Sequence, residues 1–185
     1  MTDSSSGTYT IDPANSRLGF AVRHAEITRI RGSFTEFAGH GYLDAANPSR
    51  SWARVMIRAA SVTTNNPERD ALLLGTDFLD ADRYPEITFV STGVESVDDT
   101  TFRLTGDLTM KGATRTVGIH FDLTGTSVDA TGNTRVGFYG SGVIDRREWG
   151  VTWNTPLASG GVLVSDDVEL AIDVCAIRTD EPPTR

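Results

Sequence analysis

Cysteine, basic charge and long apolar runs are all scarce in this sequence of 185 residues. The single cysteine, Cys175, cannot form an internal disulfide, and a free thiol is typical of a reducing compartment. Lys and Arg together number 17 against 25 Asp and Glu, which gives a net charge of −8. Nucleic acid and anionic membrane surfaces need a basic partner, so this acidity argues against both. No stretch is long enough for a membrane span, and the N-terminus lacks the apolar run of a signal peptide, so we expect a cytoplasmic protein.

The motifs of common catalytic sites are absent as well. The sequence contains no G-x-S-x-G, no Gly-rich phosphate loop, no H-E-x-x-H and no C-x-x-C. Its three histidines, His24, His40 and His120, are too few and too scattered to predict a zinc site. Alternation places His120 on a solvent-facing row with Gly118 and Asp122. We therefore expect no catalytic residue, no metal and no cofactor.

What the sequence does have is alternation of apolar and polar residues with a period of two, repeated in eight runs. These runs are 17–24, 27–44, 51–61, 85–97, 101–112, 115–125, 135–146 and 161–177. Turn-forming residues separate many of them, which predicts antiparallel hairpins. In the second run Phe37 breaks the parity of Ile30, Gly32 and Phe34, which predicts a bulge near residues 35–36.

The fold predicted from this pattern is all-β: an antiparallel eight-stranded barrel or sandwich, with closure favoured because it removes exposed sheet edges. One short helix is expected after the third or fourth strand, where Asn66 can cap, Pro67 fits the first turn and Gly75 can end it. Its leucines, Leu72 to Leu74, are expected to lie against the sheet or to plug one end. Residues 9–177 form the predicted domain, and 1–8 and 178–185 are predicted to be disordered tails.

Two of the inward-facing rows end on a basic or titratable residue. Leu18, Phe20 and Val22 lead to His24, and the row that contains Phe138 leads to Arg146. An apolar tube with a few polar groups at one end is what an amphipathic lipid requires. A buried guanidinium needs a partner, so Arg146 should meet water, a ligand anion or one of three carboxylates: Asp70, Asp145 and Asp166.

Three glycines also fall on the predicted inner face, at positions 106, 140 and 142. They either relieve the coiling of their strands or leave space in the lumen, and the sequence favours neither reading.

From about Tyr9 to Ile177 the chain resembles the polyisoprenoid-binding, YceI-like family. The resemblance is carried by the stretches "YTIDPANSRLGFAVRH", "IRGSFTEFAGHGYLD", "SVTTNNPERDALLLGTDFLDADRYPEITFVST", "LTGDLTMKGATRTV", "DRREWGVTW" and "VSDDVELAIDV". It implies a lipocalin-like barrel whose tunnel holds a long isoprenoid or a related acyl chain, without catalysis. Many members carry a signal peptide and act in the periplasm, whereas this sequence opens on the domain itself. Asn15 also stands where the family usually has a histidine.

The function expected is non-catalytic binding, transport or storage of a polyprenyl quinone or polyprenyl phosphate, by a protein that could form a homodimer. The ligand-binding residues expected from alternation are Phe20, Val22, His24, Phe34, Phe89, Phe138, Arg146, Trp149 and Trp153. Three alternatives remain: a carrier of fatty acids or fatty amides, a small hydrolase or isomerase that uses His24 with Asp70, and an interaction module whose barrel is filled by side chains.

Overall fold

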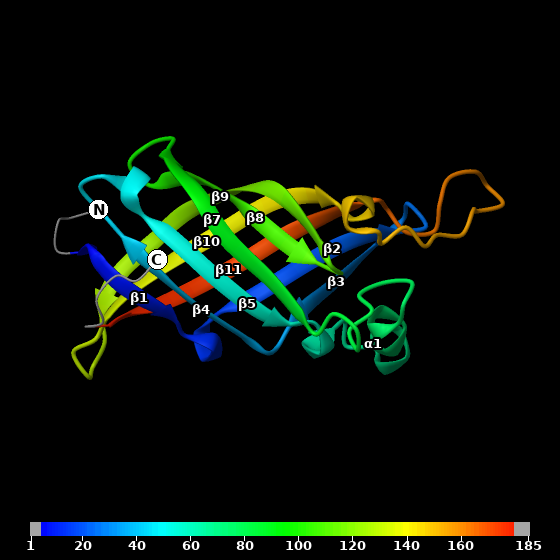
Figure 1. Cartoon of the computed structure of the whole chain (residues 1–185), viewed down its shortest axis with the longest axis horizontal. Helices are drawn as coiled ribbons and strands as arrows, with labels where there is room; N and C mark the ends of the chain where they lie inside the picture. The colour runs from blue at the N-terminus through cyan, green and yellow to red at the C-terminus, as the bar shows by residue number, and fades with distance from the viewer. Residues whose placement is uncertain (1–4, 180–185) are drawn as a thin grey trace.

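The computed structural model describes residues 5–179, and these residues form one antiparallel sheet that closes into a barrel (Figure 1). The strands of this part of the chain are β1 (Gly7–Ile11), β2 (Arg17–His24), β3 (Thr28–Phe34), β4 (Phe37–Leu43), β5 (Trp52–Arg58), β6 (Val62–Thr63), β7 (Glu86–Ser96), β8 (Thr101–Met110), β9 (Ala113–Val128), β10 (Thr134–Asp145) and β11 (Asp167–Thr179). Four short 3-10 helices, at Pro13–Asn15, Pro48–Arg50, Ala59–Ser61 and Arg146–Trp149, and one α-helix, α1 (Pro67–Leu74), complete the described elements.

The barrel closes because β1 pairs on one side with β4 and on the other with β11. From β4 the order runs through β5, β7, β8, β9 and β10 back to β11. β2 lies in line with β1, since both pair with β11, at residues 169–173 and 176–179 respectively. Together the described strands therefore form a closed antiparallel barrel of eight strands, as the alternation predicts.

At residues 35–36, where the sequence predicts a bulge, the chain bends and the run divides into two strands, β3 and β4. β4 continues the barrel beside β5, whereas β3 pairs with β2 and β6. Ser61 satisfies the backbone at the break: its main-chain oxygen accepts from the Thr35 N–H at 3.1 Å, and its hydroxyl accepts from the Glu36 N–H at 3.0 Å. The bend thus costs the long strand no buried hydrogen bond at these two amides.

Helix α1 begins and ends where the sequence predicts. The side chain of Asn66 accepts from the Arg69 N–H at 3.0 Å, Pro67 occupies the first turn and Gly75 is the C-cap. The helix lies at the end of the barrel opposite β1 (Figure 1). Leu74 packs on a cluster of buried residues, whereas Leu72 is 67% exposed, so only part of the leucine trio covers the sheet. Within residues 5–179 no helix has the length and apolarity to cross a membrane.

The boundaries of the ordered strands extend past the predicted domain at both ends. β1 starts at Gly7, inside the segment predicted to be a tail, and Ser5 and Thr8 are buried. β11 continues to Thr179 because its last residues pair with β1. The rest of the two predicted tails, residues 1–4 and 180–185, lies outside the described residues.

Candidate functional site

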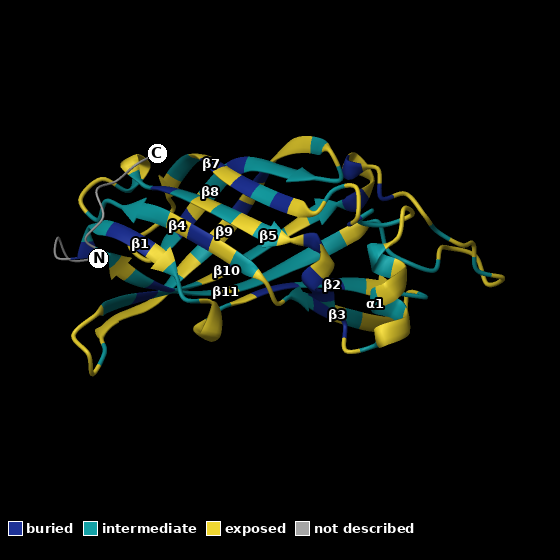
Figure 2. Cartoon of the chain, turned by 60° about the horizontal axis from the view of Figure 1, so that its bottom comes forward, coloured by how far each residue is buried: buried dark blue, intermediate teal, exposed yellow. Residues whose placement is uncertain are grey.

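The interior of the barrel contains a cavity of about 900 Å³. Many inward-facing residues of the central strands line it and yet are only half-buried, and they appear teal in Figure 2. These residues include Phe20, Val22, Ile30, Phe34, Val55, Ile57, Leu104, Leu108, Phe121, Phe138, Ile144, Leu170, Ile172 and Val174. Inner-face side chains in a packed core would be fully buried. The barrel is therefore lined by its side chains and is not filled by them.

Three phenylalanine rings occupy the space that a Cβ would take on glycines of neighbouring strands. A Cβ on Gly32 would meet the ring of Phe20 at 2.4 Å, and one on Gly140 would meet Phe121 at 2.4 Å. The same holds for Gly106, where the ring of Phe89 would be 2.4 Å away. Each of these glycines lets a ring lie along the wall, which keeps it out of the centre of the lumen.

Gly142 differs from these three positions. A Cβ there would have its nearest neighbour, the main-chain oxygen of Gly118, at an ordinary 3.4 Å. The inner-face glycines thus differ by position: Gly106 and Gly140 accommodate rings, whereas a Cβ on Gly142 would meet only ordinary contact distances.

Apolar side chains pack together at the end of the barrel near β1. Tyr9, Val136 and Ala176 form a buried cluster there, against which Leu43 and Val174 pack. The Tyr9 hydroxyl donates to the main-chain oxygen of Ser5 at 2.8 Å, and burial raises the pKa of that hydroxyl. This cluster borders the cavity at the β1 end, where the exposed His40 and Arg54 of the adjoining strands also line it.

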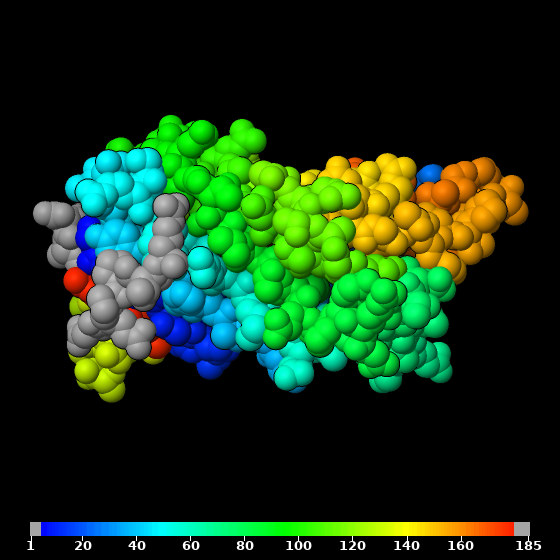
Figure 3. Space-filling model, in the orientation of Figure 1, coloured from blue at the N-terminus to red at the C-terminus, as the bar shows by residue number. Residues whose placement is uncertain are grey.

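The opposite end is framed by α1, the β2–β3 hairpin and the loop 150–166 (Figure 3). The loop is bound to the hairpin, since the Ala25 N–H donates to Leu163 at 2.7 Å and the Ser165 N–H donates to Arg23 at 2.9 Å. Trp153 of the loop contacts Phe78, which follows α1, with ring centroids 5.5 Å apart. We call this end, with its three segments, the mouth.

Arg146 holds the loop in this position. Its side chain is 5% exposed. Its Nε donates to the main-chain oxygen of Ser165 at 3.0 Å, and its Nη1 donates to those of Val151 at 2.7 Å and Trp153 at 3.0 Å. Nη2 reaches the oxygens of Val164 and Asp166, each at 3.4 Å. A guanidinium has five N–H donors, so protein acceptors account for all of them.

This corrects the expectation that Arg146 anchors a ligand. The residue lines the cavity, as predicted, but its donors are used by the loop and by Asp166, which is one of the three carboxylates expected as partners. Burial lowers the pKa of the guanidinium, and the carboxylates of Asp166 and Asp145 oppose that shift. Arginine stays charged even so, and its role here is structural.

The local sequence explains why Arg146 points inward. Asp145 caps the 3-10 helix Arg146–Trp149, since its side chain accepts from the Arg147 N–H at 2.9 Å, and Gly150 ends it with a φ of 73°. One turn then buries Arg146 and Trp149 and leaves Arg147 exposed. Arg147 donates to the Asp145 carboxylate and lowers its pKa to about 2.

The two tryptophans of this segment have different surroundings. Trp153 lines the cavity at the mouth and is 37% exposed. Trp149 is 1% exposed, packs with Phe89, Val117 and Ile119, and is not among the cavity-lining residues. Its indole N–H donates to the main-chain oxygen of Leu108 at 3.0 Å. Trp149 therefore belongs to the wall, and this geometry gives no support to its predicted contact with a ligand.

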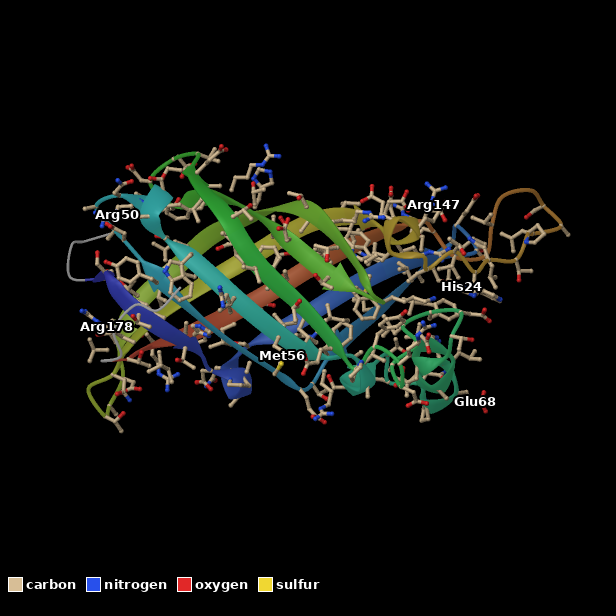
Figure 4. The ribbon with its side chains drawn as sticks, in the orientation of Figure 1. His24, Arg50, Met56, Glu68, Arg147 and Arg178 are labelled. Atoms are coloured by element: carbon tan, nitrogen blue, oxygen red, sulfur yellow. The ribbon has the colours of Figure 1, made fainter. Side chains whose placement is uncertain are left out.

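The other predicted ligand-binding residues all line the one cavity. They are Phe20, Val22, His24, Phe34, Phe89, Phe138 and Trp153, with Arg146 bound as described. His24 lies at the mouth, next to the loop, because it forms a β-bridge with Val164 (Figure 4). His120 is exposed, as its parity predicts. That these residues bind a ligand stays a prediction.

Sequence reasoning did not select Phe121 or Arg69, which also line the cavity. Phe121 continues the apolar row of Val117 and Ile119, so the alternation did carry a signal for it. Arg69 carried none, because the direction in which a short helix presents its side chains depends on how the helix packs.

Asp70, the proposed catalytic partner of His24, fastens α1 to β6. Its carboxylate accepts from the Thr64 N–H at 2.7 Å, from the Thr64 hydroxyl at 2.6 Å and from the Thr63 hydroxyl at 3.1 Å. In the described part of the chain the imidazole of His24 has no hydrogen bond, and none joins it to Asp70. Nor do three His, Cys, Asp or Glu side chains of residues 5–179 converge where they could hold a metal ion. No observation at the mouth favours the hydrolase alternative.

We expect Asp70→Ala to destabilise the protein by about 1–3 kcal/mol, because it removes three hydrogen bonds to a charged acceptor. Glu68 is exposed and lies two positions before Asp70, so Glu68→Ala should change the stability little. Urea denaturation of both variants gives the comparison. Burial raises the pKa of Asp70, but the hydrogen bonds from Thr64 and Thr63 outweigh it and lower that pKa below 3.8. The stabilisation is therefore present above pH 3.8 and is lost as the pH falls through the lower, folded-state pKa. Equal stability of the two variants at pH 7 would contradict this role.

The sequence was compared with known families and proteins. A family model described as "YceI-like domain" matches residues 9–176. A UPF0312 protein of Pseudomonas savastanoi pv. phaseolicola is 36% identical over 145 residues, which cover 77% of this chain and 76% of the relative.

Two solved structures share the fold. BcnA of Burkholderia cenocepacia superposes with a TM-score of 0.78 at 24% identity, over 89% of this chain and 98% of that one. A polyisoprenoid binding domain from Saccharophagus degradans, described as implicated in plant cell wall breakdown, gives a TM-score of 0.69 at 15% identity. That match covers 92% of this chain and 98% of the other.

Proposed function

Because the chain belongs to the YceI-like domain family, we propose that its barrel binds one long-chain isoprenoid lipid and carries or stores it without acting on it. The observation that carries this proposal is the cavity of about 900 Å³, whose wall is built from apolar side chains of nearly every strand. Its size lies within the range of small-molecule sites, and apolar surface buried by a ligand contributes about 25 cal/mol per Å².

The distribution of apolar and polar side chains around the cavity favours an amphipathic ligand. The buried cluster around Tyr9 and Val136 is apolar, whereas polar side chains such as Thr64, Asn66 and His24 line the mouth. A hydrocarbon chain would lie along the phenylalanine rings of the wall, with its polar end at the mouth. The polyisoprenoid binding domain of the same fold guides the choice of an isoprenoid over a fatty acid or fatty amide as the first ligand to test.

We expect protein purified gently from its own host to carry a hydrophobic molecule in native mass spectrometry. Organic extraction should then release an isoprenoid, and delipidated protein should take up farnesol with a one-to-one stoichiometry. Release of a fatty acid or fatty amide would contradict the isoprenoid as ligand and would support the alternative carrier function. A bare protein mass together with no uptake of any of these lipids would reject the proposed function.

Non-catalytic binding is tested in the same samples. Farnesyl phosphate, a farnesyl ester and a fatty amide incubated with the protein, with and without divalent metal ions, should be recovered intact. If the protein converts one of these ligands, and His24→Ala abolishes the conversion while binding persists, the result would support the hydrolase alternative and contradict non-catalytic binding.

A further inference from the structure

Three arginines line the cavity, and the guanidinium groups of two of them, Arg54 and Arg69, form no hydrogen bond to the described residues. Arg54 is exposed, and it alternates along β5 with the inward-facing Val55. Arg146 is bound by five acceptors of the loop. The remaining arginine is Arg69.

Arg69 lies in the first turn of α1 and is half-buried at the mouth. Its main-chain N–H is used by the Asn66 cap, but within residues 5–179 its side chain forms no hydrogen bond and no salt bridge. A guanidinium has donors only, and one that faces an apolar cavity gains most from an acceptor that also carries negative charge.

The protein does not supply that acceptor. The neighbouring Asp70 carboxylate attracts Arg69 electrostatically, yet its oxygens accept from Thr63 and Thr64. Glu68 and Asp77 also line the mouth, but both are exposed to solvent. Arg69 is thus held beside a carboxylate that already accepts three hydrogen bonds from the protein and none from Arg69.

A second polar group lies at the same end of the cavity. His24, at the end of β2, lines the cavity, and its imidazole has no hydrogen bond to the described residues. Figure 4 shows His24 at the end of the barrel where α1, with Glu68, also lies. Arg69 and His24 therefore present unpaired nitrogen atoms at the mouth, whereas the buried cluster at the other end, around Tyr9, is apolar, and the polar residues His40 and Arg54 there are exposed.

From this arrangement we propose that Arg69 recognises the head group of the ligand and that the head group is an oxyanion, a phosphate or a carboxylate. This inference rests on the proposed function, since it assumes that a lipid chain occupies the cavity. It assigns to Arg69 the role that the sequence had led us to expect for Arg146. It also places the lipid with its anionic end at α1 and its tail towards Tyr9.

Three ligands with the same chain test the proposal: farnesyl phosphate, farnesoic acid and farnesol. Isothermal titration of delipidated protein should show that at least one of the two anions binds more tightly than the alcohol. Arg69→Gln should weaken that anion by about ten- to hundredfold, the effect of losing charge-assisted hydrogen bonds, and should leave farnesol unchanged. The anion that loses affinity identifies the head group.

The matched control is Arg83→Gln, which removes the same charge from the segment that follows α1. Arg83 is exposed, stacks on Tyr84 at 5.2 Å and does not line the cavity, so the variant should bind all three ligands as the wild type does. Thermal melting confirms that each variant is folded.

Two results overturn the head-group assignment while the proposed function stands. One is a wild type that binds the alcohol as tightly as both anions, and the other is an equal loss for all three ligands in Arg69→Gln. Failure of the wild type to bind any of the three would instead reject the proposed function itself.

Discussion

Arg146→Ala is expected to lower the free energy of unfolding by about 3–5 kcal/mol, because the change strips a buried ion pair and leaves several main-chain oxygens unpaired. The oxygens of Val151, Trp153 and Ser165 would lose their donor at once. Asp166 would also lose its buried partner. Equilibrium denaturation in urea measures the loss.

The neighbouring Arg147→Ala provides the control. Arg147 pairs with Asp145 and Asp166, but its side chain is 55% exposed. Surface ion pairs of this kind contribute about 0–1 kcal/mol, so the variant should be close to the wild type. Similar, small losses for both variants would show that Arg146 does not hold the loop.

Arg146→Ala should also increase the mobility of the mouth more than that of the rest of the barrel. Without the guanidinium, the segment 150–166 keeps its contacts to the hairpin and to Phe78, together with exposed contacts of Lys111 to Gly150 and of Arg147 to Asp166. Hydrogen exchange of amides in this segment, such as Leu163, should therefore speed up more than that of the central strands.

Gly142→Phe is expected to reduce lipid affinity about hundredfold, because it places a ring inside the lumen where overpacking against a ligand is costly. Gly142 follows the inward row of Phe138 and Gly140 on β10, and a Cβ there meets ordinary contact distances. Its φ is not in the left-handed region, so the substitution fits the backbone. Titration with farnesol, alongside a thermal melt, gives the measurement.

The matched control is one residue further along the same strand. Val143 is 60% exposed on the outer face, so Val143→Phe adds a similar ring that points to solvent. This variant should bind farnesol normally. If a folded Gly142→Phe protein also binds it normally, the ligand does not occupy this part of the barrel.

Local patterns in the sequence predict most of the strands and their faces, although β1 and β6 lie outside the eight runs. Alternation of period two identified those runs, and the broken parity at Phe37 located the bend between β3 and β4, because side chains on a pleated strand must alternate between core and solvent. The boundaries of α1 could also be predicted from local sequence, because Asn66, Pro67 and Gly75 act on the adjacent backbone. For the same reason, parity alone placed His24 on the inner face.

Which of these residues have donors free for a ligand depends on contacts between distant parts of the chain. Arg146 and Arg69 are both arginines near acidic residues in sequence, yet Arg146 donates to oxygens of residues 151–166, whereas the Arg69 side chain has no hydrogen bond to any residue in the range 5–179. Trp149 and Trp153 are four positions apart, and one is in the wall while the other is at the mouth. Hydrogen-bond partners and cavity walls come from distant segments that barrel closure brings together. A local sequence pattern does not predict which distant segments will be in contact.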